Sequence, residues 1–249
     1  MQTRLPLFGR VLFVDWHGVL STDLYWASVM SGRSRVVRSA VEGRLQEIFS
    51  CGQALSDNWM LGQVSTQDLF ESVVPMLGSS RRADFLQRRI VDDCLRMKVD
   101  TELASVLGTV SGHLPVVIAT DNTNDFVEAF WRARRAKRRR DLTTPSEPTL
   151  TDTASFFDDI ICSSEVGTFK ATDPRKFFGD WLALNGLSFR DALLIDDRAD
   201  NCGAFVRVGG TSIQWPKSSA GKALALAEIV EWAAGSRVSY ATHQQNVGC

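Results

Sequence analysis

The sequence predicts an α/β fold, in which a Rossmann-like, doubly wound parallel sheet carries an inserted all-helical domain. Two observations predict this fold. From residue 99 onward, short apolar runs that suit buried strands alternate with helical patterns. Another apolar run lies near the N-terminus, and the stretch between them, residues 21–98, has helical periodicity only. The 249 residues, 44% of them hydrophobic, are enough to bury a core without disulfides.

The first strand is predicted at residues 11–14, with the sequence VLFV. This run is apolar and β-branched, and Asp15 and Gly18 end it. The chain is therefore divided into a Rossmann-like core of residues 1–20 and 99–235 and a helical insertion of residues 21–98. Within the core, residues 137–154 are expected to form a surface linker, and residues 236–249 a loose C-terminal tail.

Three helices are predicted in the insertion, because apolar residues recur three or four positions apart. The first covers residues 36–49. The second begins after Ser65, whose side chain can accept a hydrogen bond from the first turn. The third covers residues 80–97, and its inward side chains are predicted to be Phe85, Ile90, Cys94 and Leu95.

Strands and helices alternate in the rest of the chain. Asp100 is predicted to cap a helix that ends near Gly112, and Asp173 one that begins with Pro174 and ends at Gly186. Two more helices are predicted at residues 124–135 and from Ser218 or Ser219 to about residue 234. Strands are predicted at residues 115–119, 159–162, 192–195 and 211–214.

Charge and cysteine usage limit the classes of function. Lys and Arg number 28 and Asp and Glu 29, so the net charge of −1 argues against a general nucleic-acid binder. Five scattered cysteines form no zinc or disulfide pattern, which is typical of a reducing cytosol. There is no signal-peptide pattern and no apolar stretch of membrane-spanning length. We therefore expect a cytoplasmic protein without nucleic-acid or membrane partners, and the oligomeric state is left open.

Polar side chains follow the central strands at the edge where parallel α/β sheets bind ligands. The first strand ends in Asp15, the second in Thr120 and the fourth in Asp196-Asp197. Clustered carboxylates repel one another, and a divalent cation relieves that cost. Oxygen ligands without a nearby His or Cys cluster favour Mg²⁺. The sequence therefore predicts a magnesium site beside a carboxylate nucleophile, which is a combination suited to phosphoryl transfer.

Four ordered motifs resemble those of the haloacid dehalogenase-like (HAD) hydrolase superfamily. They are Val14-Asp15-Trp16-His17-Gly18-Val19-Leu20, Ile118-Ala119-Thr120, Lys170 before Asp173-Pro174, and Ile195-Asp196-Asp197-Arg198-Ala199-Asp200-Asn201. The match runs from residue 11 to about residue 215, and residues 21–98 stand where that superfamily inserts a helical C1-type cap. The resemblance implies a Mg²⁺-dependent phosphohydrolase that cleaves a small phosphomonoester through an aspartyl-phosphate.

The resemblance also implies roles for individual residues. Asp15 would be the nucleophile and a Mg²⁺ ligand, the His17 carbonyl a second ligand, and Asp196 a third, with Asp197 beside it as ligand or support. Thr120 and Lys170 would hold the transferring phosphoryl group, with substrate contacts also from Asp121 and Asn122. Asn201 resembles the residue that fixes the metal-binding loop.

The sequence departs from the family pattern at two positions. His17 stands where phosphatases of the superfamily usually carry a second aspartate, the general acid and base. Histidine can do this work near neutral pH, or it can mark a degenerate binding module without turnover. Lys170 is not followed directly by proline, so Lys176 is the alternative phosphate lysine.

Members that lack the second aspartate include enzymes that cleave carbon–halogen or carbon–phosphorus bonds. The dehalogenase branch needs no metal, and Asp196-Asp197 therefore argues against it. The phosphonoacetaldehyde hydrolase branch uses a cap lysine, and residues 21–97 contain none, with Lys98 at the expected hinge. A carbon–halogen or carbon–phosphorus substrate stays the alternative reaction.

Overall fold

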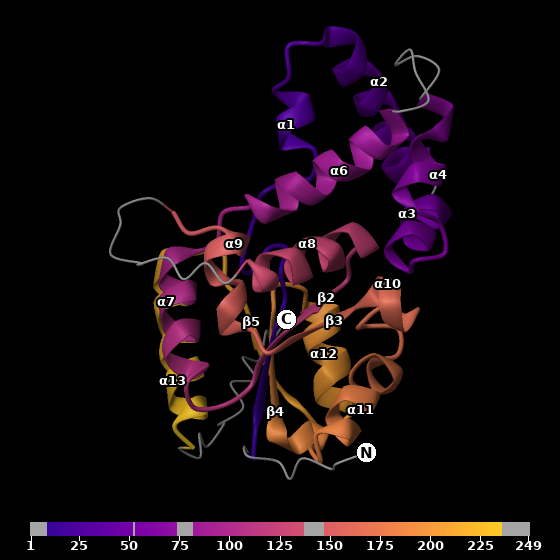
Figure 1. The fold of residues 1–249 in the computed structure, drawn as a ribbon. Coiled ribbons are helices and arrows are strands. Elements are labelled where there is room, and N and C mark those ends of the chain that lie inside the picture. Colours follow the sequence, from indigo (N-terminus) through magenta and orange to yellow (C-terminus); the bar gives the residue numbers. More distant parts are fainter. Residues whose placement is uncertain (1–8, 52, 74–81, 137–146, 236–249) are drawn as a thin grey trace, which may run out of the picture.

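A computed structural model describes residues 9–51, 53–73, 82–136 and 147–235. Five parallel strands form one sheet in the order β3-β2-β1-β4-β5 (Figure 1). The strands are β1 (Val11–Val14), β2 (Val116–Thr120), β3 (Asp159–Cys162), β4 (Ala192–Asp196) and β5 (Thr211–Gln214). The order reverses direction at β1, as in a Rossmann-like sheet, and the α/β fold class predicted from the sequence is confirmed.

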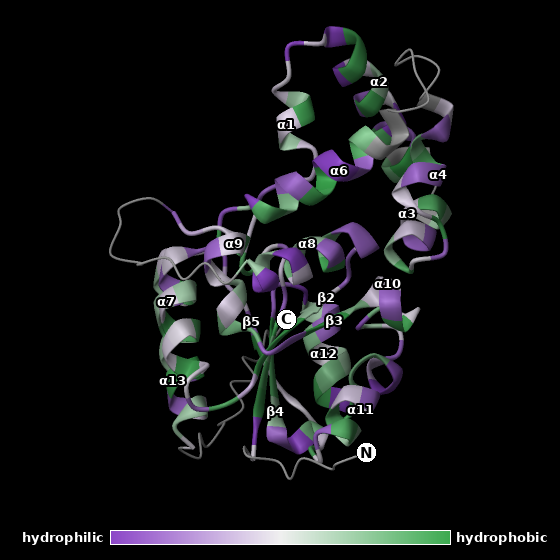
Figure 2. Ribbon diagram, viewed as in Figure 1, coloured by the Kyte–Doolittle hydropathy of each residue, from purple (hydrophilic) through white to green (hydrophobic). Residues whose placement is uncertain are grey.

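The central strand β1 shows why the strands read as continuous apolar runs. All four of its residues are completely buried, because helices cover both faces of the sheet. Leu12 and Val14 belong to one hydrophobic cluster, and Val11 and Phe13 to a second cluster on the opposite face. In Figure 2 the hydrophobic colour is concentrated in the strands, between helices of mixed character.

Helices cover the two faces of the sheet. Helices α7 (Thr101–Val110), α8 (Asn124–Arg135) and α13 (Ser219–Ala233) pack with the first cluster, and α11 (Pro174–Leu184) and α12 (Ala199–Arg207) with the second. Short turns α9 (Leu150–Thr153), η3 (Ala154–Phe156), α10 (Ser163–Val166) and η4 (Phe189–Asp191) complete the core. The side chains of Asp100, Asp173 and Ser218 cap α7, α11 and α13, as predicted.

The predicted cap region contains helices and no strand among its described residues. Its elements are α1 (Ala27–Met30), α2 (Arg35–Gln46), η1 (Glu47–Cys51), α3 (Gln53–Met60), α4 (Thr66–Phe70), η2 (Glu71–Val73) and α6 (Arg82–Leu95). They lie together beyond one end of the sheet, above α8 and α10 in the view of Figure 1. Trp26 stacks on Trp59 at 5.6 Å between ring centroids, and both rings are buried.

One prediction about a helix is wrong, and the helices α3 and α12 were not predicted. Phe85 was predicted to face inward on α6, but it is 41% exposed, and Leu86 is fully buried in its place. One residue turns a helix by about 100°, so a small error in the phase of the apolar stripe exchanges these two side chains. Helix α12 was not predicted, because it follows directly on the polar Asp196-Asp197 motif.

Parts of the predicted linker and tail lie outside the described residues, namely 137–146 and 236–249. The domain boundaries at residues 20–21 and 98–99 stay a prediction. Among the described helices, none combines the length and the apolar character needed to cross a membrane.

Candidate active site

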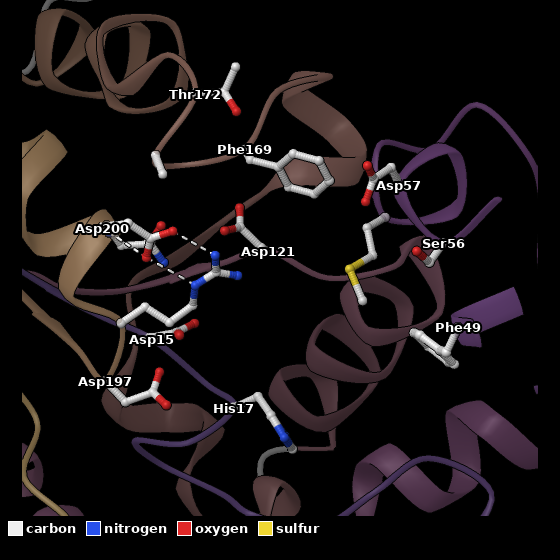
Figure 3. Close-up of a pocket in the computed structure, with 14 residues that line it drawn as sticks. Asp15, His17, Phe49, Ser56, Asp57, Asp121, Phe169, Thr172, Asp197 and Asp200 are labelled. Atoms are coloured by element: carbon white, nitrogen blue, oxygen red, sulfur yellow. Dashed lines mark hydrogen bonds and ion pairs between the residues drawn. The ribbon is translucent and has the colours of Figure 1, made fainter. Parts of the chain in front are cut away.

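A cavity of about 540 Å³ lies at the carboxyl ends of the central strands, which is a volume suited to a small molecule. Both the core and the cap region line it (Figure 3). The core contributes Asp15, His17, Asp121, Phe169, Ala171, Thr172, Asp197, Arg198, Asp200 and Asn201. The cap region contributes Phe49, Ser56, Asp57 and Met60.

Lys170 connects the strand ends from beneath this cavity. Its Nζ lies 2.9 Å from Asp15 Oδ1 and 2.5 Å from Asp196 Oδ2, and it donates a 3.0 Å hydrogen bond to the Ala119 carbonyl. The side chain is 1% exposed. An ammonium group has three N–H donors, and these three contacts provide one acceptor for each of them. The lysine therefore compensates two carboxylates that would otherwise be buried beside each other without a counter-charge.

Burial and charge act in opposite directions on the ionisable groups of this cluster. Burial raises the pKa of Asp15 to about 7, against the lowering effect of Lys170. Burial also raises the pKa of Asp121. For Lys170, burial lowers the pKa, but Asp15, Asp196 and Asp121 together raise it above its ordinary value. The lysine is thus charged at neutral pH, and Asp15 is near its midpoint in the absence of a further cation.

Asp196 is fully buried and held by several donors. The side-chain amide of Asn201 lies 3.1 Å from both carboxylate oxygens, and the Arg198 backbone N–H donates to Oδ1 at 2.9 Å. These contacts fix the carboxylate of Asp196 toward Lys170 and Asp15. The loop-fixing role that the resemblance implies for Asn201 stays a prediction.

Three carboxylates stand close enough to share one cation. An oxygen from each of Asp15, Asp196 and Asp197 lies within 4.8 Å of the others. Mg²⁺ binds oxygen at about 2.0–2.1 Å, so two ligands on opposite sides of the ion lie about 4 Å apart. A small movement of these side chains would bring all three oxygens within binding distance of one ion. The donors are all hard oxygens, which suits Mg²⁺ rather than a softer metal. The residues present therefore fit the ion that the sequence predicts.

Gly18 makes room for this arrangement. Its φ of +85° is in the left-handed region, and a Cβ at this position would lie 2.4 Å from Asp197 Oδ2. A side chain at position 18 would strain the backbone and displace Asp197 from the carboxylate set.

The structure separates the predicted substrate-binding residues. Asp121 faces the cavity, whereas Thr120 and Asn122 are buried and do not line it. Alternation along the extended chain explains this difference, because neighbouring side chains point to opposite sides. Lys176 is exposed and donates to the Gly167 carbonyl, so of the two candidate lysines only Lys170 reaches the carboxylates.

His17 and the cap region complete the surroundings of Asp15. The His17 side chain is exposed and lines the cavity on the same loop as Asp15. Asn122 joins this edge of the sheet to the cap region, because its Oδ1 accepts a hydrogen bond from the Tyr25 hydroxyl. Ser163 does the same through a 2.7 Å hydrogen bond to the Met60 carbonyl.

Sequence reasoning missed the cap residues that line the cavity. Phe49 offers one signal, because it stands outside the apolar stripe of its helix and is 51% exposed. A large aromatic residue off the buried stripe is a candidate for ligand contact. For Asp57 and Met60 no comparable signal exists, since their position depends on how α3 docks.

Comparisons with known proteins give the same fold. No protein-family model and no curated protein matches the sequence. Among solved structures, a predicted HAD-like family hydrolase from Porphyromonas gingivalis is similar, with a TM-score of 0.59 and 18% identity over 89% of this chain and 97% of that one. A HAD family enzyme from Bacteroides thetaiotaomicron, in complex with magnesium and inorganic phosphate, has a TM-score of 0.54 and 15% identity, covering 84% and 95% of the two chains.

A third similar structure is L-2-haloacid dehalogenase from Xanthobacter autotrophicus with chloropropionic acid covalently bound. Its TM-score is 0.53 and its identity 13%, over 88% of this chain and 82% of that one. At these identities the likeness establishes the fold. The chain therefore has the fold of HAD-like hydrolases, as the sequence resemblance implied.

Proposed function

We propose that the chain is a Mg²⁺-dependent phosphohydrolase of the HAD superfamily that cleaves a small phosphomonoester through an aspartyl-phosphate on Asp15. One observation carries this proposal: Asp15 faces a cavity of ligand size while Lys170, Asp196 and Asp197 surround its carboxylate. A bound Mg²⁺ would supply positive charge that screens the three carboxylates from an incoming phosphate dianion.

The two oxygens of Asp15 have different partners. Oδ1 accepts a hydrogen bond from the Trp16 N–H at 2.8 Å and contacts Lys170 at 2.9 Å. No described residue donates a hydrogen bond to Oδ2, which leaves this oxygen for the cation or for attack on phosphorus. Lys170 orients Asp15, and its charge lowers the pKa of the carboxylate against the larger, raising effect of burial.

His17 takes the role of general acid and base in this proposal. Attack by Asp15 forms an oxygen–phosphorus bond and breaks the bond from phosphorus to the alcohol oxygen, which receives a proton from His17. Water then attacks phosphorus, gives a proton to His17 and releases Asp15. The exposure of His17 at the cavity supports this role, since the leaving group and water both reach it from solvent.

The neighbours differ in the chemistry that their names record, so the reaction type has to be argued from this chain. One of them is complexed with magnesium and inorganic phosphate, and another has chloropropionic acid covalently bound. The carboxylate set of Asp15, Asp196 and Asp197 favours the first type, because it offers a cation three oxygen ligands.

A carbon–phosphorus substrate is disfavoured by the position of Lys98. Its Nζ pairs with Glu147 at 2.7 Å, and Lys98 does not line the cavity. A lysine that forms a Schiff base has to reach the substrate.

The test is a phosphomonoester panel assayed with and without Mg²⁺ on wild type, Asp15→Asn and the surface control Asp180→Asn. We expect metal-dependent turnover in wild type and the control, and none in Asp15→Asn, whose circular dichroism stays native. Metal-dependent turnover in Asp15→Asn would refute the proposed nucleophile.

The second candidate, a binding module without turnover, follows from His17 itself. His17→Asp separates the two functions. A large gain in turnover indicates a degenerate site, and a loss indicates an enzyme adapted to histidine.

A further inference from the structure

The cavity has a side remote from Asp15 that the catalytic residues do not form. Phe49 comes from η1, and Ser56, Asp57 and Met60 come from α3. In Figure 3, Asp57 lies across the cavity from Asp15, with the Phe169 ring next to it. With the phosphoryl group at Asp15, the alcohol part of a substrate extends to this side.

The charges around the cavity are unequal. Its lining carries five carboxylates, from Asp15, Asp57, Asp121, Asp197 and Asp200, and one guanidinium, from Arg198. That guanidinium is already paired, because it contacts Asp200 at 2.6 and 3.1 Å. The lining therefore has no unpaired arginine or lysine for an anionic leaving group.

Asp57 differs from the other four carboxylates. Asp15 and Asp197 belong to the cation set, Asp121 accepts the backbone N–H of Lys170 at 3.1 Å, and Asp200 binds Arg198. No side chain in the described part of the chain forms an ion pair or hydrogen bond with the Asp57 carboxylate, and this residue is only partly exposed. A bound neutral alcohol would cover this charge without compensating it, at the cost of its hydration.

An aromatic ring, that of Phe169, lies next to the Asp57 side chain (Figure 3). Phe49, Met60 and Phe169 line the cavity with it. Aromatic faces attract cations, and a carboxylate binds an ammonium by a charge-assisted hydrogen bond. A carboxylate beside an aromatic ring is thus complementary to an amine, whereas an alkyl group alone would satisfy only the ring.

We propose that the substrate is the phosphomonoester of a small amine-bearing alcohol, with its ammonium group bound by Asp57 next to Phe169. This inference rests on the proposed phosphohydrolase function and adds the substrate class. Asp57 is then a specificity-determining residue, and it takes no part in bond breaking.

The experiment uses three esters of similar size with different charge on the alcohol part: 2-aminoethyl phosphate, ethyl phosphate and phosphoglycolate. Each is assayed with Mg²⁺ on the full chain. For wild type we expect kcat/KM for the aminoethyl ester to exceed that for the ethyl ester by about 10- to 100-fold, which is the range of a hydrogen bond to a charged group. Phosphoglycolate, which is anionic, should be the poorest.

The readout for Asp57→Asn is the ratio of kcat/KM between the aminoethyl and ethyl esters. We expect this ratio to fall by about tenfold, mainly because KM for the aminoethyl ester rises. The ratio of kcat/KM between phosphoglycolate and ethyl phosphate should rise, because the variant no longer repels the anionic ester. Asp180→Asn removes the same charge from an exposed position on α11 and should keep the wild-type ratio. Phe169→Leu, which keeps an apolar side chain, should lower the ratio a few-fold by removing the ring next to Asp57.

The possible failures are distinguishable. If wild type hydrolyses none of the three esters or any other phosphomonoester with Mg²⁺, the proposed function fails, and this inference with it. If wild type hydrolyses them without preference for the amine, or Asp57→Asn keeps the wild-type ratio, only this inference is overturned.

Discussion

Replacing Lys170 by methionine tests the electrostatic basis of the site. Methionine keeps an apolar stem of similar length but has no charge to place beside Asp15 and Asp196. Lys170 is 1% exposed, and its Nζ lies 2.9 and 2.5 Å from the two carboxylates. At an effective dielectric constant of about 20, each of these attractions is worth about 6–7 kcal/mol.

Desolvation of the three ions offsets much of this attraction. Breaking a buried ion pair by removing one partner typically costs about 3–5 kcal/mol. We expect Lys170→Met to lower the free energy of unfolding by that amount at pH 7.5. The loss should be smaller at pH 5, because burial already raises the pKa of Asp15 to about 7, and without the lysine this carboxyl binds a proton still more readily and is then neutral.

Urea denaturation in the presence of EDTA measures this effect without a contribution from metal binding. Lys176→Met is the matched control, since Lys176 is exposed and its Nζ contacts only the Gly167 carbonyl at 3.3 Å among the described residues. Its unfolding free energy should change by less than about 0.5 kcal/mol. A loss in Lys170→Met no larger than that of the control would refute the view that the lysine compensates the buried carboxylates.

Two further predictions concern Gly18 and Asp125. Gly18→Ala should weaken Mg²⁺ binding in titration calorimetry, because its Cβ would lie 2.4 Å from Asp197 Oδ2, whereas Gly43→Ala in α2, with no atom within 4 Å, should bind normally. Asp125 is buried, with a raised pKa due mainly to burial, and Thr66 donates a hydrogen bond to it. Because the folded state holds this proton more tightly, the stabilisation is present below about pH 4 and is lost as the pH rises through the raised pKa. The unfolding free energy of wild type minus that of Asp125→Asn should therefore be larger at pH 4.5 than at pH 7.5, and a constant or opposite difference would contradict this reasoning.

Local patterns were sufficient to predict the sheet and the carboxylate cluster. The apolar runs are strands because both faces of the sheet are buried, and Asp15 and Asp196 meet because parallel strands end at one edge. Finer placement was not predictable. Asp121 faces the cavity, whereas Thr120 and Asn122 on either side of it are buried. Which of three consecutive polar residues faces the cavity depends on the exact residue at which the strand ends.

The cap side of the cavity depends on tertiary packing. Asp57 reaches the cavity because α3 docks beside α10, where Gly62, with a φ of +70°, lies so close that a Cβ would be 2.2 Å from the Ser164 carbonyl oxygen. No periodicity in residues 53–60 encodes that contact. The cap-region residues that line the cavity were therefore the part of the site that the sequence predicted least well.

The strand order has a consequence for how the chain folds during synthesis. β1 is made first, yet its partners are encoded much later, since Leu12 pairs with Val116 and Val14 with Ile195. At a translation rate of about 5–20 residues per second, β1 leaves the ribosome roughly 10–40 s before β4 is made. β2 and β3 are made within that interval and β2 can pair with β1, but β4 and β5 can complete the sheet only after residues 192–214 have been made, so sheet closure is a late event.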